Sequence, residues 1–536
     1  QGVGFKCCLP KTAWPRLRGK MNLADRLVEL LEEFQLNTIF GIPGEQILPF
    51  YKALADSNLN HVLVRHEQAA AHACDGYFKS LGKPAVCVAT AGPGALNLVM
   101  AVSTAFKDNV PMLILTGDNP IASKKTDEFQ SFPLKKIFKT CTVKSFNPHT
   151  GDEAVDNFAR AMHLIRGGPV HINLSKDILL NEVNKKPLKS YDKPFFYNYN
   201  KIQKFINKSE RPLIILGAGA LESKDEIRKI TKKYQIPVAT TYPAKGLVDE
   251  NENHSLGLIG NRGLERSKYA FENSDCIIAL GTRLSERTIK NTDEVKDKLI
   301  HVNIDNNCLK GKFKVHGPVK EFINHICFNN SSDWLSDILK IKDSKYADGI
   351  NDESKPLRPQ SAINTIYEVF GNNRIVNDAG SHTTWVTILK KSDDFGKLLF
   401  SGGFAPMGYG LPAAVGSSIA KPHEKIILIN GDGDFQMNMQ ELATVAENSL
   451  NILMIILNNS QYGVIKQTQR NVYNMDPFEV DLTNPDFIKI ASAYGIDSAR
   501  VTSKDELKDV LVSVKDSTKP FLLEVVVRQE DIPLPK

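Results

Sequence analysis

The stretch Lys425–Ser460 reads KIILINGDGDFQMNMQELATVAENSLNILMIILNNS. One apolar run in it ends in Gly431-Asp432-Gly433, and a second ends in Asn458-Asn459. The amphipathic residues between the two runs predict a helix, so the stretch predicts strand, helix and strand. A right-handed parallel crossover places the carboxyl ends of two such strands side by side, where ligands usually bind. Asp432 and Asn459 are therefore expected to face one crevice.

These two side chains suit a magnesium ion that also holds a phosphate group. Mg²⁺ is usually bound by one or two protein oxygens and completes its shell with water and substrate phosphate oxygens. Gly431 and Gly433 let a bulky diphosphate approach the backbone. An EF-hand starting at Asp432 fits less well, because it needs Gly where Met437 stands and Glu where Ala443 stands. A plain tight turn explains the glycines but leaves the paired asparagines unexplained.

Length and charge indicate a multidomain globular protein. The chain has 536 residues, more than one hydrophobic core normally supports, so two to four domains are expected. The net charge is +6, but residues 1–20 hold five basic residues and no acid, which leaves +1 for the rest. This balance gives no sign of nucleic acid or of an anionic membrane as a partner.

Neither a membrane span nor an oxidising compartment is expected. The sequence contains no apolar run of about 18 residues. Its eight cysteines lack the spacing of a zinc site or of a secreted disulfide framework, so a cytoplasmic location is expected. Residues 1–20 have no signal-peptide core and are interpreted as an extension or disordered tail, with a short targeting peptide as the alternative.

Helical patterns alternate with short apolar runs along the chain, which predicts an α/β fold of three domains, each a parallel sheet flanked by helices. The first domain is expected over residues 21–185. Strands are predicted at Ala85–Ala89 and Met112–Thr116, and a helix is predicted to begin at Met21. The segment Lys185–Asn200 is rich in Lys, Pro, Tyr and Asn, lacks either period, and is predicted to be a linker.

The second domain is expected over residues 201–328. Its predicted strands are Leu213–Leu216, Cys276–Leu280 and Leu299–Ile304. The polar interval Asn329–Pro359 is interpreted as the next boundary. The third domain, residues 360–536, holds the predicted metal crevice.

The spacing of the GDG and NN motifs, with 24 residues between them, resembles the binding signature of thiamine-diphosphate enzymes. The three α/β domains also resemble the 2-oxo-acid branch of that family, in which the first domain binds the aminopyrimidine ring and the last binds the diphosphate. The resemblance implies a magnesium site of Asp432, Asn459 and the backbone carbonyl of Gln461. Further cofactor contacts implied in this stretch are Gly431, Gly433 and Asp434.

In such enzymes a carboxyl group of the first domain shares a proton with a ring nitrogen of the aminopyrimidine, and Glu67 is the candidate. Burial raises a carboxyl pKa and makes such sharing possible near neutral pH. A Glu after a strand is by itself more often a helix-start charge. The neighbouring loops Phe40–Gly44 and Thr90–Asn97 match the family's loops, however, and add the cofactor contacts Pro43, Gly44, Pro93 and Asn97.

Residues 21–536 are most similar to the catalytic large subunit of acetolactate synthase. The stretch Gly402–Ala414 is close to the family loop whose Met bends the cofactor, which gives that role to Met407. The stretch Gly380–Trp385 stands at another family motif and places Ser381 and His382 at the diphosphate. By themselves, a Met is more often core filler and a lone His is usually structural.

Substrate contacts are also implied by the resemblance. Phe129 and Gln130 would line the substrate channel, and Arg287 would bind the carboxylate of the second substrate. Two positions depart from the family. Thr468 stands where a Trp shapes the acceptor pocket, and Glu45 stands where many members have a small residue. The second substrate therefore stays open.

The family binds FAD in its middle domain, so FAD is a further cofactor to be tested. A glycine pair after a strand lets dinucleotide phosphates approach, but a lone GxG is weak support. Two family segments are altered here, at Ala244–Leu247 and Gly260–Gly263. The candidate FAD contacts are Gly217, Ala218, Gly219, Thr240 and Asp305.

The expected function is a thiamine-diphosphate- and Mg²⁺-dependent acetolactate synthase of branched-chain amino-acid synthesis, which decarboxylates pyruvate and joins the product to a second 2-oxo acid. The family builds each site from two chains, so a homodimer or homotetramer is expected, with a small regulatory subunit as a further partner. The alternatives are another decarboxylase or carboligase on the same cofactor and a catalytically silent cofactor-binding paralogue. A nicotinamide dehydrogenase would rest on Gly217-Ala218-Gly219 alone and lacks the third glycine.

Overall fold

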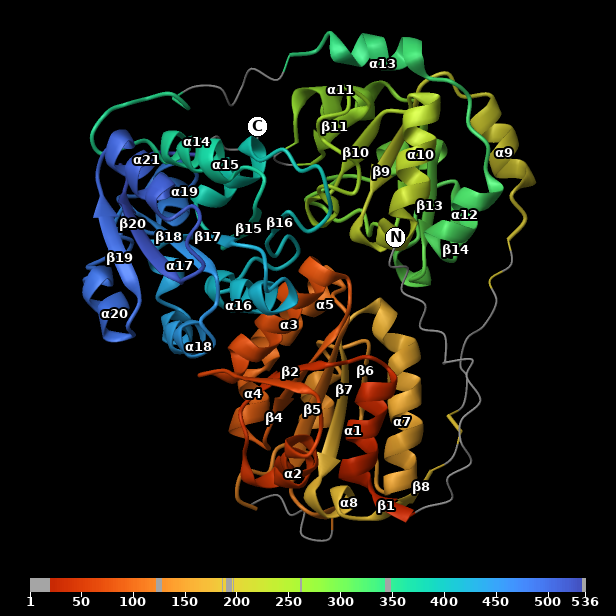
Figure 1. Ribbon diagram of the computed structural model, residues 1–536. Helices are drawn as coiled ribbons and strands as arrows, with labels where there is room; N and C mark the ends of the chain where they lie inside the picture. Colours follow the sequence, from red (N-terminus) through yellow and green to blue (C-terminus); the bar gives the residue numbers. More distant parts are fainter. Residues whose placement is uncertain are drawn as a thin grey trace.

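The computed structural model describes residues 20–121, 128–185, 187–188, 195, 197–260, 263–342 and 349–532. It contains three units, each built on a six-stranded sheet in which every pairing is parallel, which confirms the predicted fold class. Figure 1 shows the three units side by side, with helices around each sheet. Of the segments named in the sequence analysis, residues 1–19, Asn261, Arg262 and parts of Lys185–Asn200 and Asn329–Pro359 lie outside the described residues.

The first unit has the strand order β3-β2-β4-β5-β7-β6. Its strands are β2 (Thr38–Gly41), β3 (Asn60–Leu63), β4 (Ala85–Ala89), β5 (Met112–Asp118), β6 (Lys144–Phe146) and β7 (Val170–Ser175). Its helices are α1 (Leu23–Glu33), α2 (Leu48–Ala55), α3 (Glu67–Leu81), α4 (Pro93–Asn97), α5 (Val99–Asp108), α6 (Leu134–Phe138), α7 (Gly151–Leu164) and α8 (Lys176–Leu179).

The predicted helix at Met21 begins two residues later than expected. Lys20–Asn22 form strand β1, which pairs antiparallel with β8 (Glu182–Asn184). Helix α1 then starts at Leu23, because the Asn22 side chain accepts a hydrogen bond from the Asp25 N–H at 2.8 Å and caps the helix.

The middle unit has the strand order β11-β10-β9-β12-β13-β14, the order of dinucleotide-binding sheets. Its strands are β9 (Pro212–Leu216), β10 (Val238–Thr240), β11 (Ser255–Leu258), β12 (Cys276–Leu280), β13 (Leu299–Asn303) and β14 (Phe313–His316). Its helices are α9 (Asn200–Asn207), α10 (Lys224–Tyr234), α11 (Glu265–Asn273), α12 (Val319–His325) and α13 (Ser332–Leu339).

Helix α13 lies inside the interval that the sequence presents as a polar boundary. Trp334, Leu335 and Ile338 form its buried face, and the Trp334 ring packs against Tyr269 of α11. Three apolar residues on one helical face are enough to anchor this helix on the middle unit, although the surrounding segment is polar.

The last unit has the order β16-β15-β17-β18-β20-β19. Its strands are β15 (Arg374–Asn377), β16 (Leu398–Leu399), β17 (Ile426–Gly431), β18 (Ile452–Asn458), β19 (Asp497–Val501) and β20 (Phe521–Val526). Its helices are α14 (Pro359–Phe370), α15 (His382–Leu389), α16 (Gly410–Ala420), α17 (Asp432–Phe435), α18 (Leu442–Glu447), α19 (Gly463–Asn471), α20 (Phe487–Ala493) and α21 (Lys504–Ser513). Numbered within each unit, the strands of the first and last sheets follow the same order, 2-1-3-4-6-5.

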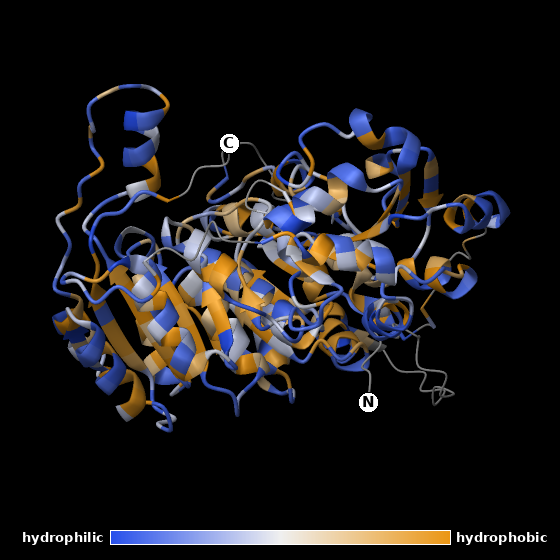
Figure 2. Ribbon diagram, turned by 90° about the horizontal axis from the view of Figure 1, so that it is seen from above, coloured by the Kyte–Doolittle hydropathy of each residue, from blue (hydrophilic) through white to orange (hydrophobic). Residues whose placement is uncertain are grey.

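The apolar runs form strands because both of their faces are covered. In β18, Met454 belongs to a hydrophobic cluster on one face of the sheet, while the adjacent Leu453 and Ile455 belong to a cluster on the other. Helices cover both faces of a parallel sheet, which explains why the strands are almost continuously hydrophobic. Figure 2 shows these strands as an apolar interior under helices with hydrophilic outer faces.

The predicted single helix between β17 and β18 is instead broken in two. Helix α17 ends at Phe435, a 3₁₀ turn η9 (Met439–Glu441) follows, and α18 begins at Leu442. The break is held by tertiary contacts, since the Asn438 side chain donates to the Gly408 carbonyl at 2.7 Å. Among the described residues, no helix is both long enough and apolar enough to cross a membrane.

The first and last units meet where α3 packs against α16. A Cβ atom at Gly416 would lie 1.9 Å from the Ala73 carbonyl oxygen, and one at Gly76 would lie 2.0 Å from that of Ala413. Ser80 and Ser417 join the two helices by a hydroxyl–hydroxyl hydrogen bond of 2.8 Å. One hydrophobic cluster therefore runs without interruption through both units.

This contact predicts that Gly416→Ala destabilises the protein. The added methyl group has to push the two helix backbones apart, and such overpacking costs about 1–3 kcal/mol. Thermal unfolding should show a lower melting temperature for Gly416→Ala than for Gly167→Ala, where the nearest atom to the new Cβ is 3.6 Å away. Equal melting temperatures for the two variants would contradict this account of the interface.

Candidate active site

A cavity of about 510 Å³ lies at the carboxyl ends of β15, β17 and β18. The chain runs from β15 to β16 on one side of it and then to β17 on its other side, so this is the switch point at which α/β sheets usually bind ligands. Most of the lining belongs to the last unit. The middle unit adds Tyr242 and Arg287.

The predicted metal ligands line this cavity together. Strands β17 and β18 pair with Gly431 opposite Leu457, which places Asp432 and Asn459 at adjacent strand ends. The Asp432 carboxylate accepts a hydrogen bond from Asn484 Nδ2 at 2.6 Å. Gln461 follows in the same turn, and its carbonyl accepts the Gly463 N–H at 3.1 Å, which uses one of its two lone pairs.

The donor set fits a hard divalent cation. Burial raises the pKa of Asp432, although Asn484 and the backbone N–H groups of Asn459 and Ser460 favour the charged form. A bound cation would repay the cost of this buried charge. Gln461 Oε1 is also buried and has no hydrogen-bond partner among the described residues. Those residues contain no cluster of three His, Cys, Asp or Glu, so a metal here depends on mixed oxygen donors.

Backbone groups and small residues form the wall beside the metal ligands. Ser381 and His382 line the cavity at the start of α15, and the backbone N–H groups at a helix start can bind an anion. A Cβ at Gly463 would lie 2.7 Å from Ser381 Oγ, and one at Gly433 would lie 2.7 Å from the Tyr462 ring. The glycines therefore keep this wall narrow, in a shape that a diphosphate group fits.

Asp378, Asn430 and Asp434 form a buried polar cluster beside these residues, and two of them, Asp378 and Asp434, line the cavity. Asn430 Nδ2 donates to Asp434 at 2.7 Å and to Asp378 at 3.0 Å, and the Gly410 N–H donates to Asp378 at 2.6 Å. Burial raises the pKa of Asp378 to about 6 and that of Asp434 well above its usual range. Polar residues at the ends of β15 and β17 were the available signal for Asp378 and Asn430.

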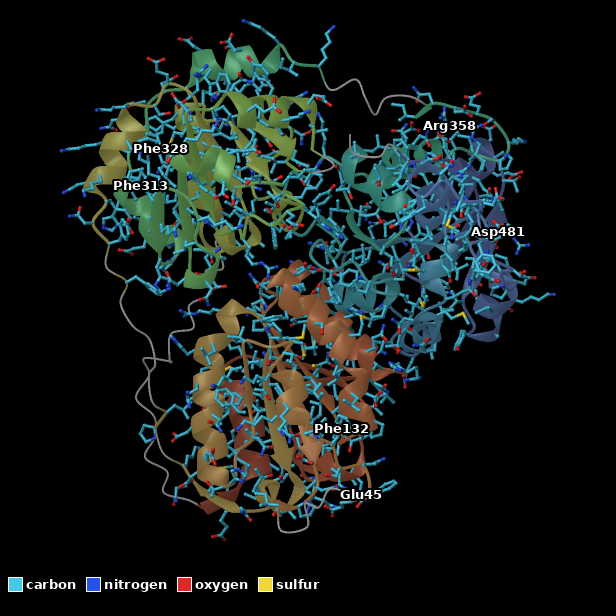
Figure 3. The ribbon with its side chains drawn as sticks, turned by 180° about the vertical axis from the view of Figure 1, so that it is seen from behind. Glu45, Phe132, Phe313, Phe328, Arg358 and Asp481 are labelled. Atoms are coloured by element: carbon cyan, nitrogen blue, oxygen red, sulfur yellow. The ribbon has the colours of Figure 1, made fainter. Side chains whose placement is uncertain are left out.

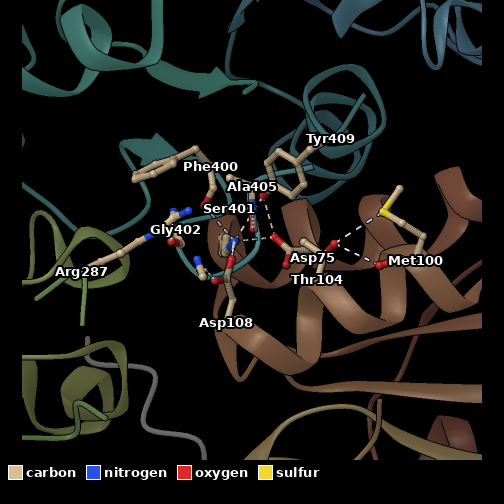
Figure 4. Close-up of polar contacts among 12 residues, drawn as sticks. Asp75, Met100, Thr104, Asp108, Arg287, Phe400, Ser401, Gly402, Ala405 and Tyr409 are labelled. Carbon is tan, nitrogen blue, oxygen red and sulfur yellow. Dashed lines mark hydrogen bonds and ion pairs between the residues drawn. The ribbon is translucent and has the colours of Figure 1, made fainter. Parts of the chain in front are cut away.

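Met407 lies in a loop that all three units hold. Arg287 Nη1 of the middle unit donates to the Gly402 carbonyl at 3.2 Å, and the Gly403 N–H donates to Asp108 of the first unit at 2.7 Å. Lys79 Nζ donates to the Phe400 carbonyl at 3.0 Å. Figure 4 shows Arg287, Asp108 and Phe400 around this loop. The half-buried Met407 lines the cavity at the end of this loop.

Lys79 is the centre of the buried charge network that anchors this loop. Its ammonium group lies 2.8 Å from Asp75 and 3.0 Å from Asp108, and Tyr409 donates to Asp75 at 2.6 Å. Burial alone would lower the pKa of Lys79, but the two carboxylates outweigh it and raise that pKa. The buried ammonium group is therefore paired with two carboxylates, as a buried charge requires, while Asp75 Oδ2 has no hydrogen-bond partner among the described residues.

The first-unit candidates do not reach the cavity of their own chain. Glu67 starts α3, and its Oε2 accepts a hydrogen bond from Asn97 Nδ2 at 2.9 Å, so Asn97 orients Glu67. Pro43 and Pro93 are exposed at the ends of β2 and β4, and Gly44 lies beside Pro43. None of these residues lines the described cavity.

Of the substrate candidates, one lines the cavity and the others do not. Arg287 lines the cavity, whereas Phe129 and Gln130 belong to the first unit and Phe129 is 76% exposed. Thr468 is outside the lining, with its hydroxyl donating to the Val464 carbonyl at 2.8 Å. Glu45 is exposed and pairs with Lys176 at 3.1 Å.

Figure 3 shows how the first-unit end is separated from the last unit. Glu45 and Phe132 lie together at one end of the first unit, away from Arg358 and Asp481 on the last unit. Asp481 pairs with Gln461 in an isolated antiparallel bridge, so it marks the metal side of the cavity.

The glycine pair of the middle unit is explained first by packing. A Cβ at Gly217 would lie 2.3 Å from the Gly281 carbonyl oxygen, and the Gly219 N–H donates to that oxygen at 3.0 Å. Thr240 is completely buried at the end of β10. Ala218 and Asp305 remain accessible at the carboxyl ends of β9 and β13.

Comparison with known proteins gives matches along most of the chain. Residues 21–137 match the N-terminal TPP binding domain of thiamine pyrophosphate enzymes, residues 199–326 the central domain, and residues 378–525 the C-terminal TPP binding domain. These matches show that thiamine diphosphate is the cofactor of this type of chain.

Three relatives illustrate the similarity to whole proteins. The probable acetolactate synthase large subunit of Methanocaldococcus jannaschii is 34% identical over 95% of this chain and 92% of that protein. The acetolactate synthase large subunit of Cyanidium caldarium is 34% identical over 94% and 92%. The mitochondrial acetolactate synthase catalytic subunit of Saccharomyces cerevisiae is 30% identical over 95% and 81%. The chain belongs to the acetolactate synthase large-subunit family of thiamine-diphosphate enzymes.

Proposed function

We propose that the protein decarboxylates pyruvate and condenses the remaining two-carbon unit with a second 2-oxo acid, as a step of branched-chain amino-acid synthesis. The observation that carries the proposal is the single cavity in which Asp432, Asn459 and Gln461 meet the N-terminus of α15. That combination offers oxygen donors to Mg²⁺ and N–H donors to a diphosphate.

Thiamine diphosphate supplies a nucleophilic ring carbon and an electron sink for the departing carbon dioxide. The residues of the chain bind and orient this cofactor. Asp432, Asn459 and the Gln461 carbonyl hold Mg²⁺, while Ser381, His382, Gly431, Gly433 and the buried Asp434 shape the diphosphate pocket. Met407 would contact the cofactor from a loop that residues of all three units hold. Glu67 moves a proton at the aminopyrimidine nitrogen, which prepares the reactive carbon.

The residues at the mouth of the cavity are proposed to select the 2-oxo acid substrates. Arg287 reaches it from the middle unit, and its guanidinium suits the carboxylate of a 2-oxo acid. Val464 and Ile465 add an apolar wall from α19, which helps to exclude water. Phe129 and Gln130 are proposed to complete the channel.

The complete site requires two chains. Glu67 and the other first-unit candidates are absent from the cavity of their own chain, and Phe129 is left largely exposed. A second copy that brings its first unit over the cavity would supply Glu67 and cover Phe129. A two-fold dimer does this twice in one interface. We therefore propose a homodimer, or a homotetramer made of two such dimers.

We also propose a small regulatory partner and a cytoplasmic location. Several relatives are named as large subunits, which supports a second, smaller subunit. The scattered cysteines support a reducing compartment. Relatives from plants and yeast carry names that place them in chloroplasts or mitochondria, so location needs its own measurement.

FAD is proposed as a further cofactor of the middle unit. The strand order places the ends of β9 and β12 at a switch point, where dinucleotides bind. Ala218, Gly219 and Asp305 are the accessible candidates there.

Pyruvate alone, with thiamine diphosphate and Mg²⁺, should yield 2-acetolactate and carbon dioxide. Omission of either cofactor should remove the activity, because the diphosphate is held through the metal. Product analysis by mass spectrometry checks this expectation. Acetaldehyde as the main product would identify a decarboxylase instead, and a condensation product that forms only when a different acceptor is added would identify another carboligase.

Glu67→Gln should lower turnover at least about 100-fold while thiamine diphosphate still binds, because the amide cannot exchange the proton. Asp432→Ala should abolish metal-dependent cofactor binding. Mixing these two inactive variants tests the shared site directly, since a mixed dimer regains one intact site. About one quarter of wild-type activity should return after subunit exchange. No recovery in verified mixed dimers would place both residues in a single-chain site.

The purified protein should show the visible absorption of a bound flavin, and chromatography after heat release should identify FAD. The reason is that Ala218, Gly219 and Asp305 are accessible to a dinucleotide at the carboxyl ends of the strands of the middle unit. A colourless protein with full acetolactate activity would remove FAD from the proposal without affecting the thiamine diphosphate site.

A further inference from the structure

Glu441 is a buried acid that the proposed function does not use. It ends η9 in the last unit, its residue is 1% exposed, and it does not line the cavity. Its carboxylate reaches instead into the first unit. The turn that it contacts joins β3 to α3 and ends directly before Glu67.

The carboxylate of Glu441 binds two consecutive backbone N–H groups of that turn. The Arg65 N–H donates to Oε1 at 3.0 Å and to Oε2 at 3.2 Å, and the His66 N–H donates to Oε1 at 3.0 Å. The Thr444 hydroxyl donates to Oε2 at 2.6 Å and fixes the orientation of the carboxylate. Charge-assisted hydrogen bonds of this kind are about twice as strong as neutral ones.

These contacts fix the start of α3 from outside the helix. His66 is its N-cap residue, and His66 Nδ1 accepts the Gln68 N–H at 3.1 Å. The first N–H groups of a helix have no partner within the helix. A negative charge near them also interacts favourably with the positive end of the helix dipole. Glu441 thus determines the backbone position of the two residues that precede Glu67.

A contact that only held the first and last units together would not need a buried carboxylate. Burial raises the pKa of Glu441, so the charged form is costly at this position. Nearby, Arg65 and Glu447 form an ion pair of 2.8 Å whose side chains are much more exposed. That pair holds the Arg65 side chain, whereas Glu441 holds the backbone.

We propose that Glu441 is a positioning residue for the reaction: through the N–H groups of Arg65 and His66 it holds Glu67 where it meets the aminopyrimidine ring. This inference rests on the proposed function, because it assumes the role of Glu67. The new point is that the last unit of each chain, through Glu441, sets the position of Glu67 in the first unit of the same chain. In Glu441→Gln one carboxylate oxygen becomes an NH₂ group, which cannot accept the hydrogen bonds that Oε2 now accepts from the Arg65 N–H and the Thr444 hydroxyl, and the negative charge on the turn is lost.

The test compares Glu441→Gln with Glu447→Gln, a matched change at the neighbouring ion pair. Glu441→Gln should lower kcat by about 10- to 100-fold, the usual cost of a misplacement near 1 Å. KM and the thiamine diphosphate Kd should stay within about 3-fold, because the residues of the cavity are untouched. Glu447→Gln should keep the wild-type kcat.

Two further measurements separate positioning from stability. Deuterium exchange at the reactive ring carbon of bound thiamine diphosphate, followed by NMR, should slow in Glu441→Gln in parallel with kcat. Backbone hydrogen exchange of the cofactor-free protein should show loss of protection at Arg65 and His66 in Glu441→Gln only.

The possible outcomes are distinguishable. If wild-type protein does not accelerate ring-carbon exchange, the proposed function itself fails. If wild type accelerates it and folded Glu441→Gln does so equally, only the positioning role is overturned. If Glu441→Gln does not fold, Thr444→Val decides, since it removes the hydroxyl that orients the carboxylate. A several-fold slower exchange in Thr444→Val supports the role, and a wild-type rate overturns it.

Discussion

The packing of α3 against α16 is the constraint on which the rest of the structure depends. Glycines at the crossing bring two helix backbones into contact, and one hydrophobic cluster then spans the first and last units. Close-packed interiors transmit small displacements because they contain few voids. The loop of Met407, the turn before Glu67 and the charge network around Lys79 all lie at this joint, so their geometry follows from it.

Buried charge is concentrated where it supports the candidate site. Asp432, Asp434 and Asp378 line the cavity, and Glu441 and Lys79 lie at the joint between units. Each is satisfied by backbone N–H groups, amides or an opposite charge, as desolvated ions require. The polar groups that line the cavity of the last unit are therefore already oriented before a cation or an anion binds.

Much of this architecture could be predicted from the sequence, because strands buried on both faces leave continuous apolar runs. Ala85–Ala89 and Cys276–Leu280 are strands at the predicted residues, and the predicted metal ligands share one cavity. The break between α17 and α18 was not predictable, because it depends on partners such as Arg65, which stands 376 residues before Glu441. Helix α13 was missed because its three apolar anchors are embedded in a polar segment. The glycine pair at Gly217 suggested a phosphate site, whereas a contact between two turns already explains Gly217. The local sequence pattern does not show contacts between residues that are far apart in the chain.

The identical strand order of the first and last sheets has a consequence for how this architecture arose. One ancestral module, copied and fused, would present the same kind of crevice twice in every chain. After such a duplication one copy is free to specialise in an anionic tail, and the other in a heteroaromatic head. In the proposed dimer, the first unit of one chain and the last unit of the other would bind opposite ends of one elongated molecule, and both would use the same type of sheet.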